Sequence, residues 1–357
     1  MISGPLLQTI SRRMVLLATI YDVARLAKVS KTTVSKVLSN TPYVSEETRK
    51  RVLEAMTQLQ YSPNLAARGL KNNRKYVIGL IVPHHPYHLF HDPFILDIVL
   101  GVESTASSHD YSVLLFIPKP TDKQGVYDRF LRTGYVDGVV TLESHQGGID
   151  DQVLDELGIP RVSAGYREDL KQINSVHSND RLGAYQALSH LLTLGHRTIG
   201  IISGPQNFVV AVEERMRGAR DALAEWSVEL DPQLVAFGDF TVESGYQAAQ
   251  KILGGARRPT AIFNMNDRMA AGVMHYARDH GLSIPRDLSL IGFDDIAIPT
   301  IVEPPLTTIH QYPEMIGQVA TEHLFELING EITIFPTIVL PVELIVRETT
   351  APPTMMD

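Results

Sequence analysis

The sequence has no cysteine among its 357 residues. This absence excludes a disulfide framework, catalysis by a thiolate and zinc sites built from cysteine, and it fits a reducing cytoplasm. No apolar run approaches the roughly 18 residues that a membrane-spanning helix needs. Signatures of phosphate-binding loops, dinucleotide-binding loops, zinc peptidases and serine hydrolases are missing in the context they require. With 44% hydrophobic and 20% charged residues, the chain is typical of a soluble globular protein of about two to three domains.

The first residues contain a short apolar run, MVLLATI, directly after Arg12 and Arg13. An export signal would need a cleavage site of small residues, and this run is short and leads straight into an amphipathic basic segment. We therefore expect residues 1–18 to be a disordered extension, or an upstream start with Met14 as the true initiator.

Charge is distributed unevenly along the chain. Residues 19–75 contain 11 Lys and Arg against 4 Asp and Glu, a net charge of +7, although the whole protein carries −8. Arg12 and Arg13 add two positive charges, so residues 76–357 carry −17. A basic head on an acidic body predicts that one end of the protein seeks a polyanion while the other has a different task.

The basic head has the pattern of three short helices. Apolar residues recur at helical spacing in residues 21–28 and 31–38, and Ser30 is a good N-cap for the second helix. Ser45 with Thr48 predicts the start of a third helix over RKRVLEAMTQL. Two short helices joined by a tight turn, with a third beneath them, make a helix-turn-helix, whose second helix enters the major groove. On charge alone, a small three-helix bundle with a solvated lysine face would fit as well.

The segment after the third helix indicates a hinge. Pro63 can begin a new short helix. The following LAARGLKNN is weakly amphipathic, contains Gly69 and is too short to be helical alone in water. Such a helix would form only against a partner. Lys71, Arg74 and Lys75 come next, and they should add salt-dependent attraction to phosphates.

Three stretches, TIYDVARLAKVSKTTVSKVLSN, PYVSEETRKRVLEAM and YSPNLAARGL, together resemble the DNA-binding head and hinge of the LacI/GalR family of bacterial transcription repressors. The resemblance runs nearly continuously from Thr19 to about Thr350. It implies that Lys31, Thr32 and Lys36 read bases, because Lys suits guanine acceptors and a Thr methyl suits the thymine methyl.

The resemblance also implies phosphate contacts and a minor-groove wedge. The expected phosphate-positioning residues are Ser30, Thr33, Ser35, Tyr43 and Asn64. Leu70, with Ala67 beside it, matches the hinge residue that inserts between base pairs at the operator centre and kinks the duplex. Gly69 lowers the helix propensity of the hinge by up to about 1 kcal/mol, so its folding should depend strictly on DNA.

From Tyr76 onward, short apolar strands alternate with amphipathic helices. The strand-like runs are residues 77–83, 111–117, 137–142, 161–165, 198–204, 260–265 and 288–295. This alternation predicts a doubly wound α/β fold with parallel sheets, and its length predicts two lobes. The resemblance implies the type I periplasmic-binding-protein fold behind an all-α helix-turn-helix head.

The expected domain organisation follows from these patterns together with the resemblance, which implies that the chain crosses between the lobes. It comprises a DNA-binding domain at 19–63, a hinge at 64–75, an effector-binding and dimerisation core at 76–350, and a tail at 351–357. The core is divided into a first lobe at about 76–176 plus 308–336 and a second lobe at about 177–307 plus 337–349. The tail has two prolines and no heptads, so no tetramerisation helix is expected.

Ligands of such folds bind beyond the carboxyl ends of the strands, between the lobes. Six residues near strand ends match positions that contact the effector in the family: Phe94, Tyr166, Arg215, Phe240, Asn266 and Asp294. The planar guanidinium of Arg215 suits bidentate contact with hydroxyls or carboxylates. Many members have Asp-Arg where this chain has Gly165-Tyr166, and Tyr166 offers a stacking face in place of the acidic contact.

Several neighbouring residues have two interpretations. Asp267 is either an effector contact or the cap of the following helix, and Asp295 is expected to be a structural partner. Phe293, like Phe94 and Phe240, either stacks on a ligand or packs in the core.

Four histidines lie close together in the loop after the first strand: His84, His85, His88 and His91. Imidazole is a common metal ligand, but the prolines of this loop leave the four residues without fixed helical spacing. We expect no metal site and no cofactor, and interpret the loop as lining the mouth of the cleft, where His85 or His88 could contact the effector.

These observations predict a cytoplasmic transcriptional regulator, more specifically a repressor, that associates with the nucleoid when bound to its operator. It should bind a pseudo-palindromic operator as a homodimer. Its operator affinity should be controlled by a small molecule, a sugar or sugar derivative in preference to a purine. The alternatives are a solute-binding protein or a sugar- or nucleotide-acting enzyme on the same core fold. The basic head argues against both, and no enzymatic activity is expected.

Overall fold

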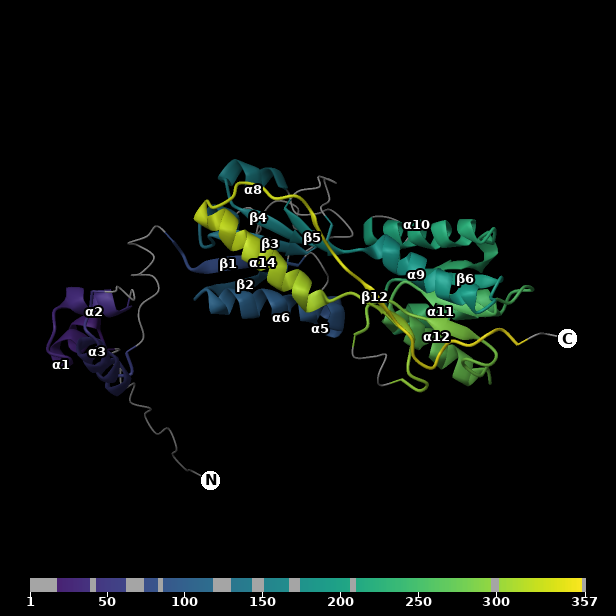
Figure 1. Cartoon of the computed structure of the whole chain (residues 1–357), viewed down its shortest axis with the longest axis horizontal. Coiled ribbons are helices and arrows are strands. Elements are labelled where there is room, and N and C mark those ends of the chain that lie inside the picture. The colour runs from purple at the N-terminus through teal and green to yellow at the C-terminus, as the bar shows by residue number, and fades with distance from the viewer. Residues whose placement is uncertain are drawn as a thin grey trace, which may run out of the picture. The chain divides into compact units, whose positions relative to one another are not determined.

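The computed structural model of the protein describes residues 18–38, 43–61, 74–82, 86–117, 130–142, 151–166, 174–205, 210–296 and 302–354. The chain forms two compact units, Met1–Lys75 and Tyr76–Asp357, shown in Figure 1. The expected N-terminal extension and most of the expected hinge lie outside the described residues.

The first unit contains the three expected helices. They are α1 (Ile20–Leu26), α2 (Lys31–Leu38) and α3 (Glu46–Gln58). Helix α1 begins at Ile20 because Thr19 and Asp22 cap it reciprocally. The Thr19 side chain accepts from the Asp22 amide, while the Asp22 carboxylate accepts from the Thr19 amide at 2.9 Å. Ser45 caps α3 by accepting from the Thr48 amide at 3.4 Å.

A small apolar core holds these helices together. Val23 of α1, Val34 of α2 and Val52 of α3 are fully buried and belong to one cluster. A core of this size gains only a few kcal/mol from burial, so the caps that fix the helix ends contribute substantially to the stability of the head.

The second unit begins with a six-stranded parallel sheet in the order β11-β5-β4-β3-β1-β2. Its strands are β1 (Val77–Ile81), β2 (Ser112–Phe116), β3 (Gly138–Leu142), β4 (Arg161–Ala164), β5 (Ser175–Ser178) and β11 (Ile338–Leu340). Among the described residues, four helices accompany it: α5 (Pro86–His91), α6 (Pro93–Ser108), α8 (Asp151–Leu157) and α14 (Pro313–Asn329). We call this assembly lobe 1.

Side chains of the central strands alternate between two apolar layers. Ile78 and Leu80 of β1 belong to the cluster that contains residues of α6 and α14, whereas Ile81 belongs to the cluster that contains residues of α8. The sheet is thus covered on both faces, which explains why its strands read as nearly continuous apolar runs.

Helices α6 and α14 are in backbone contact. A Cβ atom on Gly101 would lie 2.0 Å from the Glu314 carbonyl oxygen, and one on Gly317 would lie 2.2 Å from the Ile98 carbonyl oxygen. Neither position can hold a larger residue unless the helices separate.

The remaining elements form lobe 2 around a four-stranded parallel sheet in the order β7-β6-β8-β9. Its strands are β6 (Ile199–Ser203), β7 (Val235–Phe237), β8 (Ala261–Asn264) and β9 (Ser289–Ile291). Its helices are α9 (Asp180–Thr193), α10 (Val210–Glu225), the 3₁₀ turn η1 (Pro232–Leu234), α11 (Val242–Leu253) and α12 (Asp267–Asp279). Helix α9 pairs with α10, and α11 pairs with α12, on opposite sides of the sheet (Figure 1).

The chain passes between the lobes three times. It leaves β5 for α9 at Asn179, returns from β10 (Thr308–His310) to α14, and leaves β11 for β12 (Glu343–Ile345). Strands β10 and β12 pair antiparallel beside lobe 2, where bridges join Thr307 to Ile291 and His310 to Asp294.

Three expected lobe boundaries differ from the structure. Residues 308–310 were expected in lobe 1 but pair with β12 beside lobe 2, and residues 338–340 were expected in lobe 2 but pair with β5 in lobe 1. The first boundary, expected after residue 176, cuts through β5. These strands are three or four residues long, too short to reveal a period or a partner.

Among the helices that the structure describes, none has the length and apolar character that a bilayer crossing requires.

Candidate functional site

The exposed face of α2 presents the residues expected to read bases. Lys31, Thr32 and Lys36 are all exposed. The Lys31 ammonium donates to the Tyr21 hydroxyl at 3.3 Å and lies 4.9 Å from the centre of that ring. Tyr21 was not expected to take part, since its position before the first apolar residues of α1 gave no signal. In the structure it holds the Lys31 side chain beside the exposed start of α2.

The residues expected to contact phosphates are placed differently from one another. Ser30 caps α2, because its hydroxyl accepts from the Thr33 amide at 3.0 Å and lies 2.8 Å from the Thr33 hydroxyl. Thr33 and Ser35 are half-buried, while Tyr43 is 92% exposed. The remaining expected DNA contacts, Asn64, Ala67 and Leu70, lie outside the described residues.

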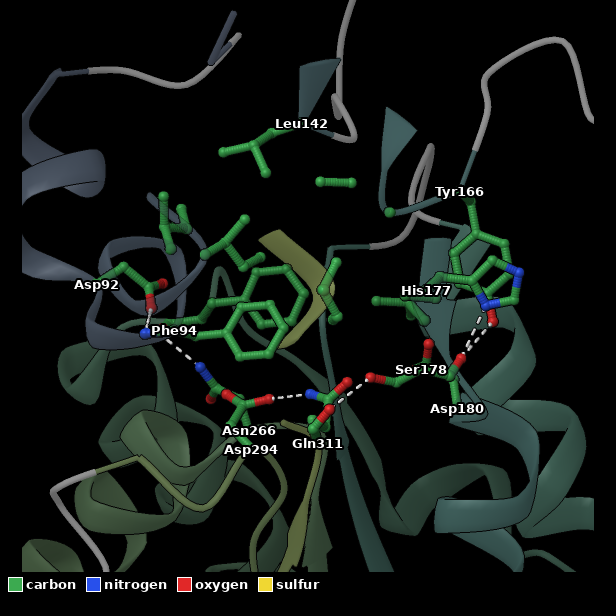
Figure 2. A pocket seen from close by; sticks show the side chains of 18 of the residues that line it. Asp92, Phe94, Leu142, Tyr166, His177, Ser178, Asp180, Asn266, Asp294 and Gln311 are labelled. Atoms are coloured by element: carbon green, nitrogen blue, oxygen red, sulfur yellow. Dashed lines mark hydrogen bonds between the residues drawn. The ribbon is translucent and has the colours of Figure 1, made fainter. Parts of the chain in front are cut away.

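A cavity of about 840 Å³, including solvent at its mouth, lies between the carboxyl ends of the strands of the two lobes. All six residues expected to contact an effector line it: Phe94, Tyr166, Arg215, Phe240, Asn266 and Asp294. Five further polar residues that were not expected also line it: Asp92, His177, Ser178, Asp180 and Gln311. Figure 2 shows Asp92 and Phe94 on one side of the cavity, with Tyr166 and His177 on the other.

Arg215 is held in place by several contacts. Its Nε donates to Asp180 Oδ1 at 2.6 Å, and its Nη1 donates to the Met265 carbonyl and lies 3.8 Å from Asp294 Oδ1. The guanidinium carbon stands 3.9 Å from the centre of the Phe293 ring. Phe293 is fully buried and does not line the cavity, so its role is packing beneath Arg215.

Asp294 is buried next to this arginine. Burial raises the pKa of the Asp294 carboxyl well above its usual value, although the charge of Arg215 opposes the rise. The Gln311 side-chain Nε2 donates to Asp294 Oδ1 at 2.6 Å, and the Gln311 main-chain carbonyl accepts from the Ser178 hydroxyl at 3.1 Å. Figure 2 shows this chain of hydrogen bonds running through Gln311. These hydrogen bonds link Asp294 of lobe 2 to the passages between the lobes after β10, at Gln311, and after β5, at Ser178.

An aromatic pair forms the opposite side of the cavity. The rings of Tyr166 and His177 stack, with their centres 3.8 Å apart and an angle of 22° between the ring planes. His177 Nδ1 lies 2.8 Å from the Ser178 carbonyl oxygen, which fixes the orientation of the imidazole. Together with Phe94 and Phe240, the pair gives the cavity flat apolar surfaces as well as polar groups.

The structure assigns the helix cap after β8 to Asn266. Its Oδ1 accepts from the Met269 amide at 2.9 Å, while its Nδ2 donates to the Phe240 carbonyl at 3.2 Å. Of the two interpretations of Asp267, the helix cap is therefore wrong, because the cap lies one residue earlier. Asp267 is fully buried instead, and accepts from the Thr308 hydroxyl at 2.5 Å and from the Ile296 amide at 3.3 Å.

Asp295 contacts neighbouring side chains and stabilises the local structure, as expected. Its carboxylate accepts from Arg347 at 2.7 Å and lies 3.1 Å from His310 Nδ1. Since both partners belong to the β10–β12 region, Asp295 ties the end of β9 to the crossing strands.

The histidine loop is only partly described. His84 and His85 lie outside the described residues, as does the side chain of His88, and His91 ends the short helix α5. Within the described ranges, no group of three or more histidine or acidic side chains could hold a metal ion.

The unexpected cavity residues lie mainly at chain crossings. Asp180 and Gln311 follow β5 and β10, where the chain passes between the lobes. They line the cavity because the two lobes meet there, which no local sequence pattern indicates. Asp92 carried a local signal, because an aspartate directly before Pro93 is a typical helix start. That signal indicates a cap and gives no hint of a cavity.

Comparison with known proteins agrees with this arrangement. A profile described as "Bacterial regulatory proteins, lacI family" matches residues 19–64, and one described as "Periplasmic binding protein-like domain" matches residues 188–350. The HTH-type transcriptional regulator CelR of Thermobifida fusca is 35% identical over 332 residues, covering 92% of this chain and 97% of the relative. The HTH-type transcriptional repressor PurR of Vibrio cholerae is 36% identical over 318 residues, covering 88% and 93%.

Solved structures are similar over the same length. The CelR–cellobiose complex has a TM-score of 0.73 at 34% identity, covering 93% of this chain and 99% of that one. The lac repressor dimer bound to operator and the anti-inducer ONPF has a TM-score of 0.77 at 29% identity, covering 94% and 99%. With its helix-turn-helix head and two-lobed core, the chain belongs to the LacI family of bacterial regulatory proteins.

Proposed function

We propose that this DNA-binding regulator is a repressor whose operator affinity is controlled by a small uncharged sugar or sugar derivative in the cavity between its lobes. The observation that carries the proposal is the coexistence of two sites in one chain. One is the exposed basic face of α2, and the other is the enclosed cavity at the strand ends. A free solute-binding protein would have no use for the first site.

The electrostatics of the cavity favour an uncharged ligand. Among the described lining residues Arg215 is the one arginine or lysine, and it is already paired with Asp180 and close to Asp294. A phosphorylated ligand would therefore meet no unneutralised positive charge in this part of the lining. Carboxylates and the Asn266 amide suit hydroxyl groups, and the aromatic rings suit the apolar face of a sugar ring.

Two related proteins indicate the same ligand class. CelR has been solved with cellobiose, and the lac repressor with ONPF. A purine is the second candidate, because PurR is among the relatives and the Tyr166–His177 stack could receive a flat base. The acidic lining favours the sugar.

Action on DNA should follow the dimeric arrangement of the lac repressor bound to its operator. Two heads related by a two-fold axis would place their α2 helices in successive major grooves. A ligand that binds one arrangement of the lobes more tightly shifts operator affinity by that difference. The protein would act in the cytoplasm, without enzymatic activity.

A thermal-shift screen followed by an operator-binding assay tests this proposal. Neutral mono- and disaccharides, sugar phosphates and purines are compared, and a specific ligand raises the unfolding temperature by mass action. The identified ligand must then change binding to an operator selected from random duplexes. Stabilisation by sugar phosphates alone, or no preference for any duplex sequence at any salt concentration, would refute it.

A further inference from the structure

An ion pair between described residues joins the two lobes across the cleft. Arg268 Nη1, in the first turn of α12 in lobe 2, donates to Asp92 Oδ2, before α6 in lobe 1, at 3.1 Å. The exposed fractions of the two side chains are 10% and 16%. Both charges are therefore largely removed from water in this arrangement of the lobes.

The two carboxylate oxygens of Asp92 have separate partners. Oδ1 accepts from the Phe94 amide at 3.1 Å and caps α6, a bond drawn in Figure 2, while Oδ2 faces Arg268. An asparagine at this position could keep the cap through its own oxygen. The ion pair can thus be removed without removing the helix cap.

Because the pair is buried, the energetic effect of each charge depends on whether its partner is present. Removing a carboxylate from water is costly, and burial raises the pKa of Asp92 even though Arg268 opposes the rise. The attraction between two such charges roughly offsets their desolvation, whereas one buried charge without its partner is strongly unfavourable. Separation of the lobes would return both charges to water, so this balance enters only the closed arrangement.

We infer that Asp92 and Arg268 form a charge-matched gate, which favours closure of the cleft when both charges are present or both are absent and opposes it when only one is present. Arg268 does not line the cavity and acts through Asp92, which does. The inference concerns the regulation of the site described above and rests on the proposed function for its biological meaning. The closure that it describes can be measured without any ligand.

The absence of cysteine allows a direct measurement of closure. Ser107 of α6 and Lys251 of α11 are exposed, one on each lobe. Ser107→Cys and Lys251→Cys would accept a spin-label pair, with labelled chains diluted in unlabelled protein. Distances between the labels then report the populations of open and closed cleft for the parent, Asp92→Asn, Arg268→Gln and the double variant.

Each single variant should lower the closed-to-open ratio about tenfold or more, because it leaves one buried charge unmatched. The double variant should return to within about threefold of the parent, so the two effects are far from additive. Arg278→Gln, which removes an exposed pair with Asp279 on the same helix, should change nothing.

Two results would overturn the inference. One is an unchanged distance distribution in both single variants. The other is a double variant whose closed-to-open ratio falls by the combined effect of the two single variants. If Asp92→Asn alone weakens effector binding while Arg268→Gln leaves the distances unchanged, Asp92 is only a ligand contact. A parent that responds to no ligand would count against the proposed effector and would leave the ligand-free comparison intact.

Discussion

Arg215 and Asp180 are joined by a 2.6 Å hydrogen bond inside the core, where both side chains are almost fully buried. Asp180 is the first residue of α9, directly after the first passage between the lobes. The guanidinium that faces the cavity is therefore fixed by a residue at a passage between the lobes, so the cavity lining and this passage share one contact.

Arg215→Lys should uncouple the effector from DNA. Lysine keeps a positive charge near Asp180 but loses the planar fork that serves several acceptors at once. We expect effector affinity to fall about tenfold or more, with operator binding retained and no longer responsive. Calorimetry and gel mobility shift measure the two activities, and circular dichroism checks the fold. A full effector response in this variant would exclude Arg215 as a ligand contact.

Leu70→Ala tests the expected minor-groove wedge, which lies outside the described residues. Loss of the apolar side chain should reduce the kink that it stabilises in the duplex. Operator affinity should fall at least about tenfold, while effector binding measured by calorimetry stays unchanged. Leu53→Ala, at an exposed leucine of α3, serves as the control. Equal operator affinity in both variants would argue against the wedge.

Lys31→Ala should weaken operator binding by about tenfold or more and relax the preference for one base pair. Its ammonium projects from the start of α2, with Tyr21 as its neighbour. Lys50→Ala removes the same charge from the exposed surface of α3 and should change affinity mainly through salt-dependent attraction. Competition assays against operator variants would distinguish the two effects. Identical losses for both variants would indicate that Lys31 makes no base contact.

Gly101→Ala should destabilise lobe 1 by about 1–3 kcal/mol. The new methyl group would lie 2.0 Å from the Glu314 carbonyl oxygen, so α6 and α14 must move apart. Gly255→Ala is the matched control, because its nearest neighbour would be 3.5 Å away, an ordinary contact distance. Urea denaturation of both variants gives the difference. Equal midpoints would mean that the helices can separate at little cost.

Asp267 should make the stability of the core depend on pH. Burial raises the pKa of its carboxyl to about 8, against the opposing hydrogen bonds from Thr308 and Ile296. Between about pH 4 and pH 8 the folded state holds a proton that the unfolded state has lost, so the free energy of unfolding falls as pH rises through this window.

Asp267→Asn should reduce that slope by about 1.4 kcal/mol per pH unit. Asp287→Asn provides a contrast, because the pKa of that exposed carboxyl is lowered by its hydrogen bond with Arg286 and it titrates below this window. Denaturant unfolding at several pH values measures both slopes. A slope unaffected by Asp267→Asn would contradict the raised pKa.

The principal strands and the helix caps could be predicted because their signals are local. Apolar runs such as 137–142 and 198–204 are long enough to identify buried strands, and Ser30 and Ser45 sit where caps belong. The six cavity residues could be predicted only from the resemblance to the LacI/GalR family, and the structure places all six in the lining of the cavity.

Other features depend on contacts that no local pattern contains. Strand β5, with the sequence SVHS, has one apolar residue, and it exists because β4 and β11 pair with it. The choice between Asn266 and Asp267 as the cap depends on a single residue of register. Asp92 and Arg268 are 176 positions apart, and only the meeting of the lobes makes them partners.

The threefold passage of the chain between the lobes limits how the core can be divided. Lobe 1 is assembled from separate lengths of chain, since β11 and α14 come from beyond lobe 2. No single continuous fragment contains a complete lobe 1 without most of lobe 2, and a protease cut at any one passage would leave two covalent links in place. A truncation intended to isolate lobe 1 would therefore remove strands from the sheet it was meant to preserve.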